Sequence, residues 1–340
     1  MNPPASFSGR IVPGLFALLL VSCTAGVAPT VTPAISSTSV PLTGDTVFVA
    51  SDAWNTRAGG AFELLSVGSG RTATRLTVCT SCPTFGMAPS LDRTRVALRR
   101  VTSDTNRDSR LDEQDRVTLL LVDLARQVEG PFLPDGWTNA GVDWASDGTF
   151  LVHASASDSG PEDLWQIDAN AQNNSRLVLT PNIRERFPRI DPAITRVVYE
   201  RIDGTGPGKS EIYVFLSTTV QTKIADSGIV GEQLPGTLYL VGSDSGPDYS
   251  PDGASVVFRR LTSTAVAGGA WDILVTGASG GSPRVIASGP QFRSMPDWGK
   301  EGIVFAEQNL STGGTDIVAV DPSTLGRRVI QSFGAGYKAI

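Results

Sequence analysis

One short segment of the chain carries the residue types of a calcium-binding loop. Residues 104–115 read DTNRDSRLDEQD, with acidic or amide side chains at loop positions one, three, five, nine and twelve. Hard oxygen ligands at this spacing wrap around one Ca²⁺, helped by a backbone carbonyl from position seven and an apolar residue at position eight. The predicted ligands are Asp104, Asn106, Asp108, Arg110 through its carbonyl, Asp112 and Asp115. The segment therefore predicts a structural Ca²⁺ ion.

Two positions of this loop depart from the calcium pattern. Ser109 replaces the glycine usual at position six, and Asp115 replaces the longer, bidentate glutamate at position twelve. The flanking segments RRVTS and RVTLLLVDL have the composition of strands rather than helices. We expect the loop to connect two strands as a long hairpin insertion, and an acidic loop without metal is the alternative.

Cys79 and Cys82 form the closely spaced pair CTSC. Beyond the cytoplasmic membrane, two cysteines this close are usually oxidised to one another, which predicts a short structural disulfide. A redox-active pair would require a following helix to lower a thiol pKa, whereas Pro83 and a strand-like segment follow. A zinc site would require two further cysteine or histidine ligands, which the chain does not offer.

Nucleophilic catalysis finds little support in the sequence. Gly277–Gly281 reads GASGG and formally matches a nucleophile elbow centred on Ser279, but the strand-like SPRVIAS follows where a helix is required. We interpret the segment as a hairpin turn. The single histidine, His153, precedes it and aligns with strand residues of the other repeats, so we expect a packed side chain. One histidine also excludes multi-histidine metal sites.

Chemistry based on carboxylates alone stays open. Glu162 with Asp163, and Asp244 with Asp248, are acid pairs that could lie at the mouth of a central channel. The alternative interpretation, which we prefer, is that they are solvated side chains of blade-edge loops.

The N-terminal residues carry an export signal. Arg10 precedes the apolar run IVPGLFALLLV, which is too short to span a bilayer but suits a signal-peptide core. The run ends in LVSC at Cys23, which resembles the bacterial lipobox and implies acylation of that cysteine. We predict a lipoprotein signal peptide over 1–22 and a Ser/Thr/Pro-rich tether over 23–44, with an ordinary signal peptide as the alternative.

Composition and charge limit the function classes. The 340 residues include 36 glycines, 22 prolines and 40% hydrophobic residues, with no long helical period. The 28 basic and 34 acidic residues give a net charge of −6, which removes a general electrostatic case for nucleic acid or anionic lipid as a partner.

From Asp45 onward the chain repeats one pattern. YSPDGASVVF, WASDGTFLVH, IDPAITRVVY and PSLDRTRVAL each join an apolar or ring residue, a turn rich in Asp, Gly or Pro, and a β-branched run, and WGKEGIVF is a shortened copy. The copies begin 46 to 59 residues apart, a spacing that suits propeller blades. With the N-terminal strand segments they predict six four-stranded antiparallel blades over 45–340. The final residues GYKAI would supply the missing inner strand and close the ring.

The SPDG turn and the strands after it resemble the WD40-like (PD40) repeats of the TolB propeller family. The resemblance covers nearly everything from Asp45 onward, although only YSPDGASVVF matches the motif closely. It implies an all-β, six-bladed, periplasm-facing propeller. TolB proteins place an α/β domain before the propeller, where this chain has the tether, so partners are not carried over.

These observations predict a monomeric, lipid-anchored, extracytoplasmic β-propeller in the cell envelope. We expect it to be a scaffold that binds an envelope protein or a small ligand at one propeller face, with no nucleic-acid partner. The alternative is a propeller enzyme, a lyase or hydrolase acting on polysaccharide or peptide through channel carboxylates.

Overall fold

The computed structural model describes one of two units of the chain. The units are Met1–Ala34 and Ile35–Ile340, and every described residue lies in the second. The described residues are 47–53, 62–67, 73–75 and 84–339, except 91, 93, 102–103, 106, 108–114, 125, 127, 134–136, 158–159, 171–173, 179, 181, 205, 218–219, 300–301 and 335–336. They include no helix, and therefore none long and apolar enough to cross a membrane.

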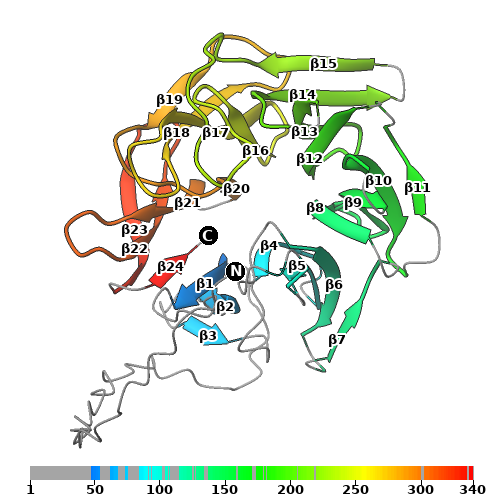
Figure 1. Ribbon diagram of the computed structural model, residues 1–340. Coiled ribbons are helices and arrows are strands. Elements are labelled where there is room, and N and C mark those ends of the chain that lie inside the picture. The colour runs from blue at the N-terminus through cyan, green and yellow to red at the C-terminus, as the bar shows by residue number, and fades with distance from the viewer. Residues whose placement is uncertain are drawn as a thin grey trace, which may run out of the picture. The chain divides into compact units, whose positions relative to one another are not determined.

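The strands pair into six four-stranded antiparallel sheets, which confirms the predicted all-β propeller class (Figure 1). Two blades are formed by β4 (Thr84–Pro89), β5 (Arg95–Val101), β6 (Val117–Asp123) and β7 (Val128–Pro131), then β8 (Trp137–Trp144), β9 (Phe150–Ser157), β10 (Asp163–Asp168) and β11 (Asn174–Arg176). The next is formed by β12 (Ile183–Ile190), β13 (Val197–Asp203), β14 (Ser210–Ser217) and β15 (Val220–Ala225). Two more are formed by β16 (Asp244–Tyr249), β17 (Ser255–Ser263), β18 (Ala270–Gly277) and β19 (Arg284–Ala287), then β20 (Asp297–Gly299), β21 (Gly302–Gln308), β22 (Thr315–Val320) and β23 (Arg327–Phe333).

The remaining sheet combines strands from both ends of the described chain. Its order is β24-β1-β2-β3, with β1 (Val47–Ala53), β2 (Phe62–Val67), β3 (Ala73–Arg75) and β24 (Tyr337–Ala339). The prediction of six blades therefore needs a correction: five blades are continuous in sequence, and the other four strands form a composite sheet. The expected closure by the final residues is confirmed, since Ser51 pairs with Ala339 and Ala53 with Tyr337.

The repeated turn after the inner strands is built from side-chain hydrogen bonds. The Ser250 hydroxyl donates to Asp252 Oδ1 at 2.5 Å, and the same oxygen accepts the Ala254 backbone N–H at 3.0 Å. The arrangement recurs where the Ser90 hydroxyl donates to Asp92 Oδ1 at 2.6 Å. Short polar side chains that bind nearby backbone favour turns over continued strand, which explains why this repeat is visible in sequence.

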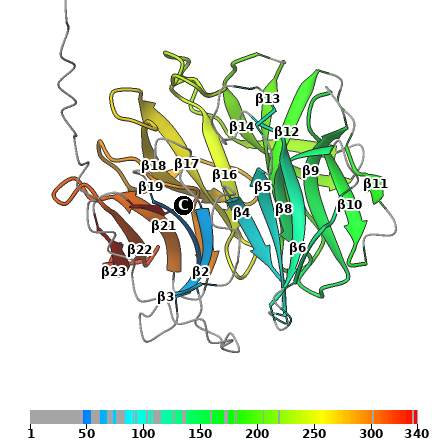
Figure 2. The same ribbon diagram turned by 60° about the horizontal axis from the view of Figure 1, so that its bottom comes forward.

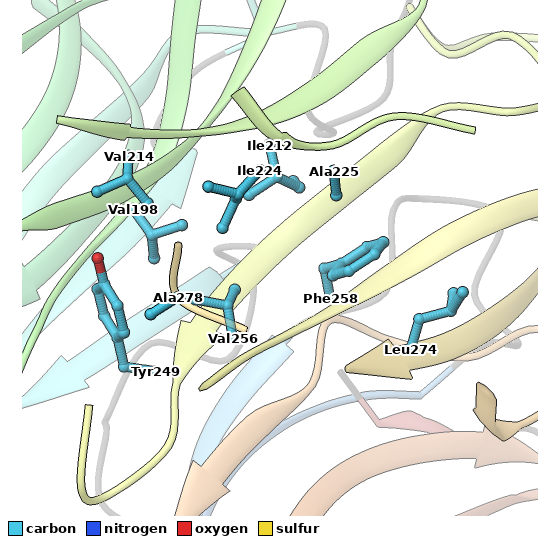
Figure 3. Close-up of a cluster of buried hydrophobic side chains, with 10 residues drawn as sticks. All are labelled: Val198, Ile212, Val214, Ile224, Ala225, Tyr249, Val256, Phe258, Leu274 and Ala278. Atoms are coloured by element: carbon cyan, nitrogen blue, oxygen red, sulfur yellow. The ribbon is translucent and has the colours of Figure 1, made fainter. Parts of the chain in front are cut away.

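Neighbouring blades pack through apolar faces. Figure 3 shows one such layer, in which side chains of the blade β12–β15 meet those of the blade β16–β19. Its members are Val198, Ile212, Val214, Ile224, Ala225, Tyr249, Val256, Phe258, Leu274 and Ala278, all at most 5% exposed. Burial on both faces of a blade explains why the second strands read as continuous β-branched and aromatic runs.

The inner strands carry a β-bulge at a recurring position. The pairing register shifts between Asn139 and Gly141 in β8 and between Arg186 and Arg189 in β12. Phe187 occupies the second of these bulges with φ 49°, a left-handed value uncommon for a bulky residue. Gly141 has φ 154°, and a Cβ there would lie 2.6 Å from Phe187 Cα. The absence of a side chain at Gly141 therefore lets the next blade approach.

We predict that Gly141→Ala destabilises the propeller by about 2 kcal/mol or more, because overpacking against fixed backbone adds to the strain of a positive φ. Gly130→Ala is the matched control, since a Cβ at Gly130 meets nothing within 4 Å. Urea unfolding of both variants measures the difference. Equal midpoints for Gly141→Ala and wild type would contradict the close approach.

Candidate functional site

Charged side chains at the ring centre bind the backbone of the adjacent blade. Each inner strand is an edge strand, whose backbone groups on one side lack a partner in their own sheet. Asp143 of β8 accepts the Ile190 backbone N–H at 2.8 Å, and Asp248 of β16 accepts the Trp298 backbone N–H at 2.6 Å. These carboxylates therefore satisfy edge amides of the following blade.

Arginines do the same for edge carbonyls. Arg99 of β5 donates to the Asn139 carbonyl at 3.1 and 3.2 Å, and Arg259 of β17 donates to the Arg293 carbonyl at 3.0 Å. The first bond joins β5 to the inner strand β8 of the next blade, and the second joins β17 to the segment that precedes β20. These charged side chains therefore have a structural role, because they satisfy buried backbone groups, and the composition of the chain does not reveal that role.

The blade β12–β15 departs from this pattern, because it has a basic residue at the position where other blades have an acidic one. Where three of the other repeats have Asp143, Asp248 and Asp297, it has Arg189, and the blade β4–β7 has Ala88. Arg189 donates to the Val142 carbonyl at 3.0 Å, and its Nε lies 3.7 Å from Asp248 Oδ1. One guanidinium thus sits among three carboxylates.

Burial controls the protonation of this cluster. Burial raises the pKa of Asp143 to about 6, against the opposing effects of Arg189 and the Ile190 N–H. Burial also raises the pKa of Asp248 well above its usual range, and the charge of Asp297 adds to the rise. For Arg189, burial alone would lower the pKa, but the surrounding carboxylates outweigh it and the net shift is upward.

Toward the other end of the inner strands, an acid and an arginine stand opposite one another in three blades, and they are bonded in two of them. Asp244 of β16 pairs with Arg260 of β17 and forms two bonds, at 2.6 and 2.8 Å. Arg293 binds Glu307 at 2.7 Å, with the acid and the base exchanged between the strands. Buried ions of this kind are stable only when paired and hydrogen-bonded.

The third copy of this pair is not formed. Glu185 of β12 stands opposite Arg201 of β13, but Arg201 Nε binds Asp203 Oδ1 at 3.0 Å instead. Glu185 is 0% exposed, and among the described residues neither of its carboxylate oxygens has a hydrogen-bond partner of ordinary geometry. Burial raises the pKa of Glu185 to about 8, the nearby Asp163 adds to the rise, and the Thr180 hydroxyl and Arg201 offset it only in part. Glu185 is therefore a protonated acid at neutral pH.

The interpretation of the two acid pairs as solvated loop residues is wrong. Asp163 is 5% exposed and Asp244 is 0% exposed, because both point into blade packing rather than outward. Asp163 lies 3.3 Å from Arg176, and Glu162 lies 3.6 and 3.8 Å from the guanidinium Nε atoms of Arg184 and Arg186. Each acid has a cationic neighbour, which the sequence spacing did not show.

His153 and Ser279 occupy the places expected for them. His153 is 0% exposed, with Nδ1 2.9 Å from the Ser155 hydroxyl and Nε2 3.2 Å from Asn174 Oδ1. Burial lowers its pKa to about 4, so it is a neutral packed side chain. Ser279 lies exposed in the turn between β18 and β19, which confirms the hairpin interpretation of GASGG.

The predicted calcium loop connects β5 and β6, as expected, because Val101 pairs with Val117 at its base. Asp115 is 6% exposed and accepts the Thr105 backbone N–H at 2.7 Å, and Asp104 accepts the Arg107 N–H at 2.5 Å. These bonds bring the first and last predicted ligands to one end of the loop. The other four predicted ligands, Asn106, Asp108, Arg110 and Asp112, lie outside the described residues.

Within the part of the chain that is described, no three His, Cys, Asp or Glu side chains gather as metal ligands. Cys23, Cys79 and Cys82 also lie outside it, so the lipid anchor and the disulfide stay predictions.

Sequence reasoning missed the roles of Asp143, Arg189 and Glu185. A partial signal existed, because stacking the five repeats places an aspartate at this position in three copies, an arginine in one and an alanine in one. Their partners, however, belong to the neighbouring blade.

The geometry defines a β-propeller, and solved structures agree. The chain is similar to TolB from Acinetobacter baumannii (TM-score 0.60, 13% identity, covering 86% of this chain and 66% of that one). It is also similar to a putative TolB from Agrobacterium tumefaciens (TM-score 0.58, 15% identity, 87% and 98% covered) and to an oligogalacturonate lyase in complex with manganese (TM-score 0.50, 15% identity, 85% and 73% covered).

At these identities the likeness shows the fold alone. The chain spans slightly less than two thirds of the A. baumannii TolB. No family model and no curated protein matches the sequence. Function must therefore be argued from the residues.

We predict that Glu185→Gln removes a pH dependence from stability. The folded pKa of about 8 exceeds the ordinary value of 4.5, so the unfolded carboxyl ionises first and stability falls as pH rises between these values. Relative to wild type, the variant should gain on the order of 4 kcal/mol between pH 5 and pH 8. Urea unfolding at both pH values measures the gain.

Glu232→Gln, at an exposed glutamate, is the control and should show no such gain. A constant difference between Glu185→Gln and wild type across this pH range would contradict the buried, protonated acid.

Proposed function

We propose that this chain is a lipid-anchored, extracytoplasmic β-propeller that binds an envelope protein at the face carrying segment 226–243. The observation that carries the proposal is an exposed apolar pair on a rigid loop. Ile229 and Val230 are 58% and 67% exposed. The export signal, the lipobox-like LVSC and the fold shared with TolB support the location.

Segment 226–243, between β15 and β16, is held in place by its own backbone and by the core. The Val241 N–H donates to the Glu232 carbonyl at 2.8 Å, and the Gly231 N–H donates to the Val241 carbonyl at 2.9 Å. Leu234 and Tyr239 are buried against a cluster that includes Trp271. A preorganised loop loses little conformational entropy on binding, so an exposed apolar pair on it favours recognition of a partner.

Binding is better supported than the enzyme alternative. Asp248, one of the carboxylates expected to do chemistry in a channel, accepts a backbone N–H of the following blade, as does the neighbouring Asp143. Asp244 holds Arg260 through both oxygens. These carboxylates are bound to structural partners, whereas the side chains of Ile229 and Val230 are mostly exposed to solvent.

We predict that Ile229→Asp with Val230→Asp abolishes specific crosslinking to an envelope protein in intact cells, because charge at a desolvated interface centre is strongly unfavourable. Val128→Asp is the matched control: Val128 is 59% exposed but lies on the outer strand β7. Crosslinked adducts are compared on membranes from cells expressing the full chain. Adducts that persist in the double variant, or that disappear equally in the control, would overturn the proposal.

We also propose that Ca²⁺ orders the loop at 104–115. The bond between Thr105 and Asp115 brings the first and last positions of the loop to one end, and both positions carry carboxylates, which suit a hard cation. The ion would neutralise aspartates that otherwise repel one another. Its role would be local order within the envelope rather than chemistry.

Calcium should therefore raise the melting temperature and slow proteolysis of this loop. At about 100 times its dissociation constant, the ion adds roughly 2.7 kcal/mol to the free energy of unfolding. Asp104→Ala with Asp108→Ala should lose that gain and keep the propeller fold. Magnesium at the same concentration is the control ion and should have a smaller effect. No calorimetric signal on adding millimolar Ca²⁺ to chelator-treated protein would show that the loop is only an acidic hairpin.

A further inference from the structure

A polar cavity of about 260 Å³ opens beside the connection between β21 and β22. It is formed by that connection, by the ends of the two strands and by the segment leading from β19 to β20. The lining residues are Gln291, Glu307, Gln308, Asn309, Leu310, Ser311, Asp316 and Arg327. All except Leu310 carry hydrogen-bonding side chains, which is unusual, because pockets for drug-sized ligands are mostly apolar and about 300–1,000 Å³ in volume.

Two buried carboxylates form the floor of this cavity. Glu307 and Asp316 stand opposite one another on β21 and β22 and are 5% and 7% exposed. Glu307 is fully paired, since it binds Arg293 Nε and Arg327 Nη2, each at 2.7 Å. Asp316 accepts only the side-chain amide of Asn309, at 2.9 Å on Oδ2.

Several groups of the lining keep hydrogen-bonding capacity for a ligand. The Gln291 side chain uses its oxygen to accept from Arg293 at 3.0 Å, which leaves its NH₂ group. Among the described residues, neither the Gln308 side-chain amide nor Asp316 Oδ1 has a partner. The cavity thus offers a carboxylate acceptor beside amide donors and acceptors.

The charges of the site balance. Glu307 and Asp316 are matched by Arg293 and Arg327, so an ionic ligand would leave one charge uncompensated. Hydroxyl groups donate and accept at once, and therefore suit a carboxylate next to primary amides. Leu310, 56% exposed at the rim, supplies an apolar contact for C–H groups.

We propose that this cavity binds one unit of a neutral saccharide. Asp316 accepts from one sugar hydroxyl, Gln308 and Gln291 bond neighbouring hydroxyls, and Leu310 packs on the ring. The site lies at the end of the blade β20–β23 that carries the β21–β22 connection, and its lining includes no residue of segment 226–243. The saccharide proposal is therefore tested independently of the protein-docking proposal.

Titration of the full chain with glucose, galactose and N-acetylglucosamine, followed by NMR chemical shifts, tests the inference. We expect at least one to bind with a dissociation constant of about 1 mM, in the weak range typical of a small solvent-exposed ligand. Asp316→Ala and Gln308→Ala should each weaken binding tenfold or more. Gln331→Ala is the control, because Gln331 lies on β23 of the same blade and does not line the cavity.

Gln308→Ala keeps the test valid if Asp316→Ala fails to fold, because within the described part of the chain only the Gln308 backbone, not its side chain, forms hydrogen bonds. Serine, as a zwitterion, and inorganic phosphate are titrated in parallel. No sugar binding by wild type, binding only of serine or phosphate, or unchanged sugar affinity in Gln308→Ala would each overturn the proposal.

Discussion

The free edge of each inner strand is the constraint on which the ring depends. Four-stranded blades satisfy their own ladders, but the strand nearest the centre leaves backbone N–H and C=O groups without partners. The propeller supplies them from the preceding blade: Asp143 and Asp248 bind amides, and Arg99 and Arg259 bind carbonyls. The same bonds that satisfy the edge groups therefore also join neighbouring sheets, which stand next to one another around the ring in Figure 2.

This use of charge explains why a central cluster of acids is weak evidence for catalysis here. A carboxylate that accepts a backbone N–H from the next blade is committed to the fold, and the raised pKa of Asp143 follows from its burial rather than from a chemical task. The groups free to act are those that the ring does not need. They lie on the connections: Ile229 and Val230 between blades, and Gln308 at the end of β21.

Much of the fold was predictable because its signals are local. The Ser250–Asp252 turn bonds within a few residues, and the strand runs after it follow from burial on both faces. The hairpin site of the calcium loop and the closing role of Tyr337–Ala339 followed from the same period. The site was harder to predict from the sequence. Asp143 and Ile190 are separated by 47 residues, and the burial of Asp163 depends on a neighbouring blade. The solvated interpretation of that acid failed because exposure is not a local property.

Two blades change the acid–arginine pair that recurs between the first and second strands, and these changes go beyond what the stability of the propeller requires. A repeat conserves what every blade needs, so a blade that changes a recurring pair either loses stability or uses the change. In the blade β12–β15 the pair is not formed: Arg201 binds Asp203 instead, and Glu185 is buried with no cation bound to it among the described residues. Keeping the acid protonated avoids the cost of a buried charge. In the blade β20–β23 the acid and base exchange strands, which brings Glu307 to the cavity wall beside Asp316 and lets Arg327 join it. The first change makes the stability of the ring depend on pH, and the second places a buried acid pair in the lining of a polar cavity.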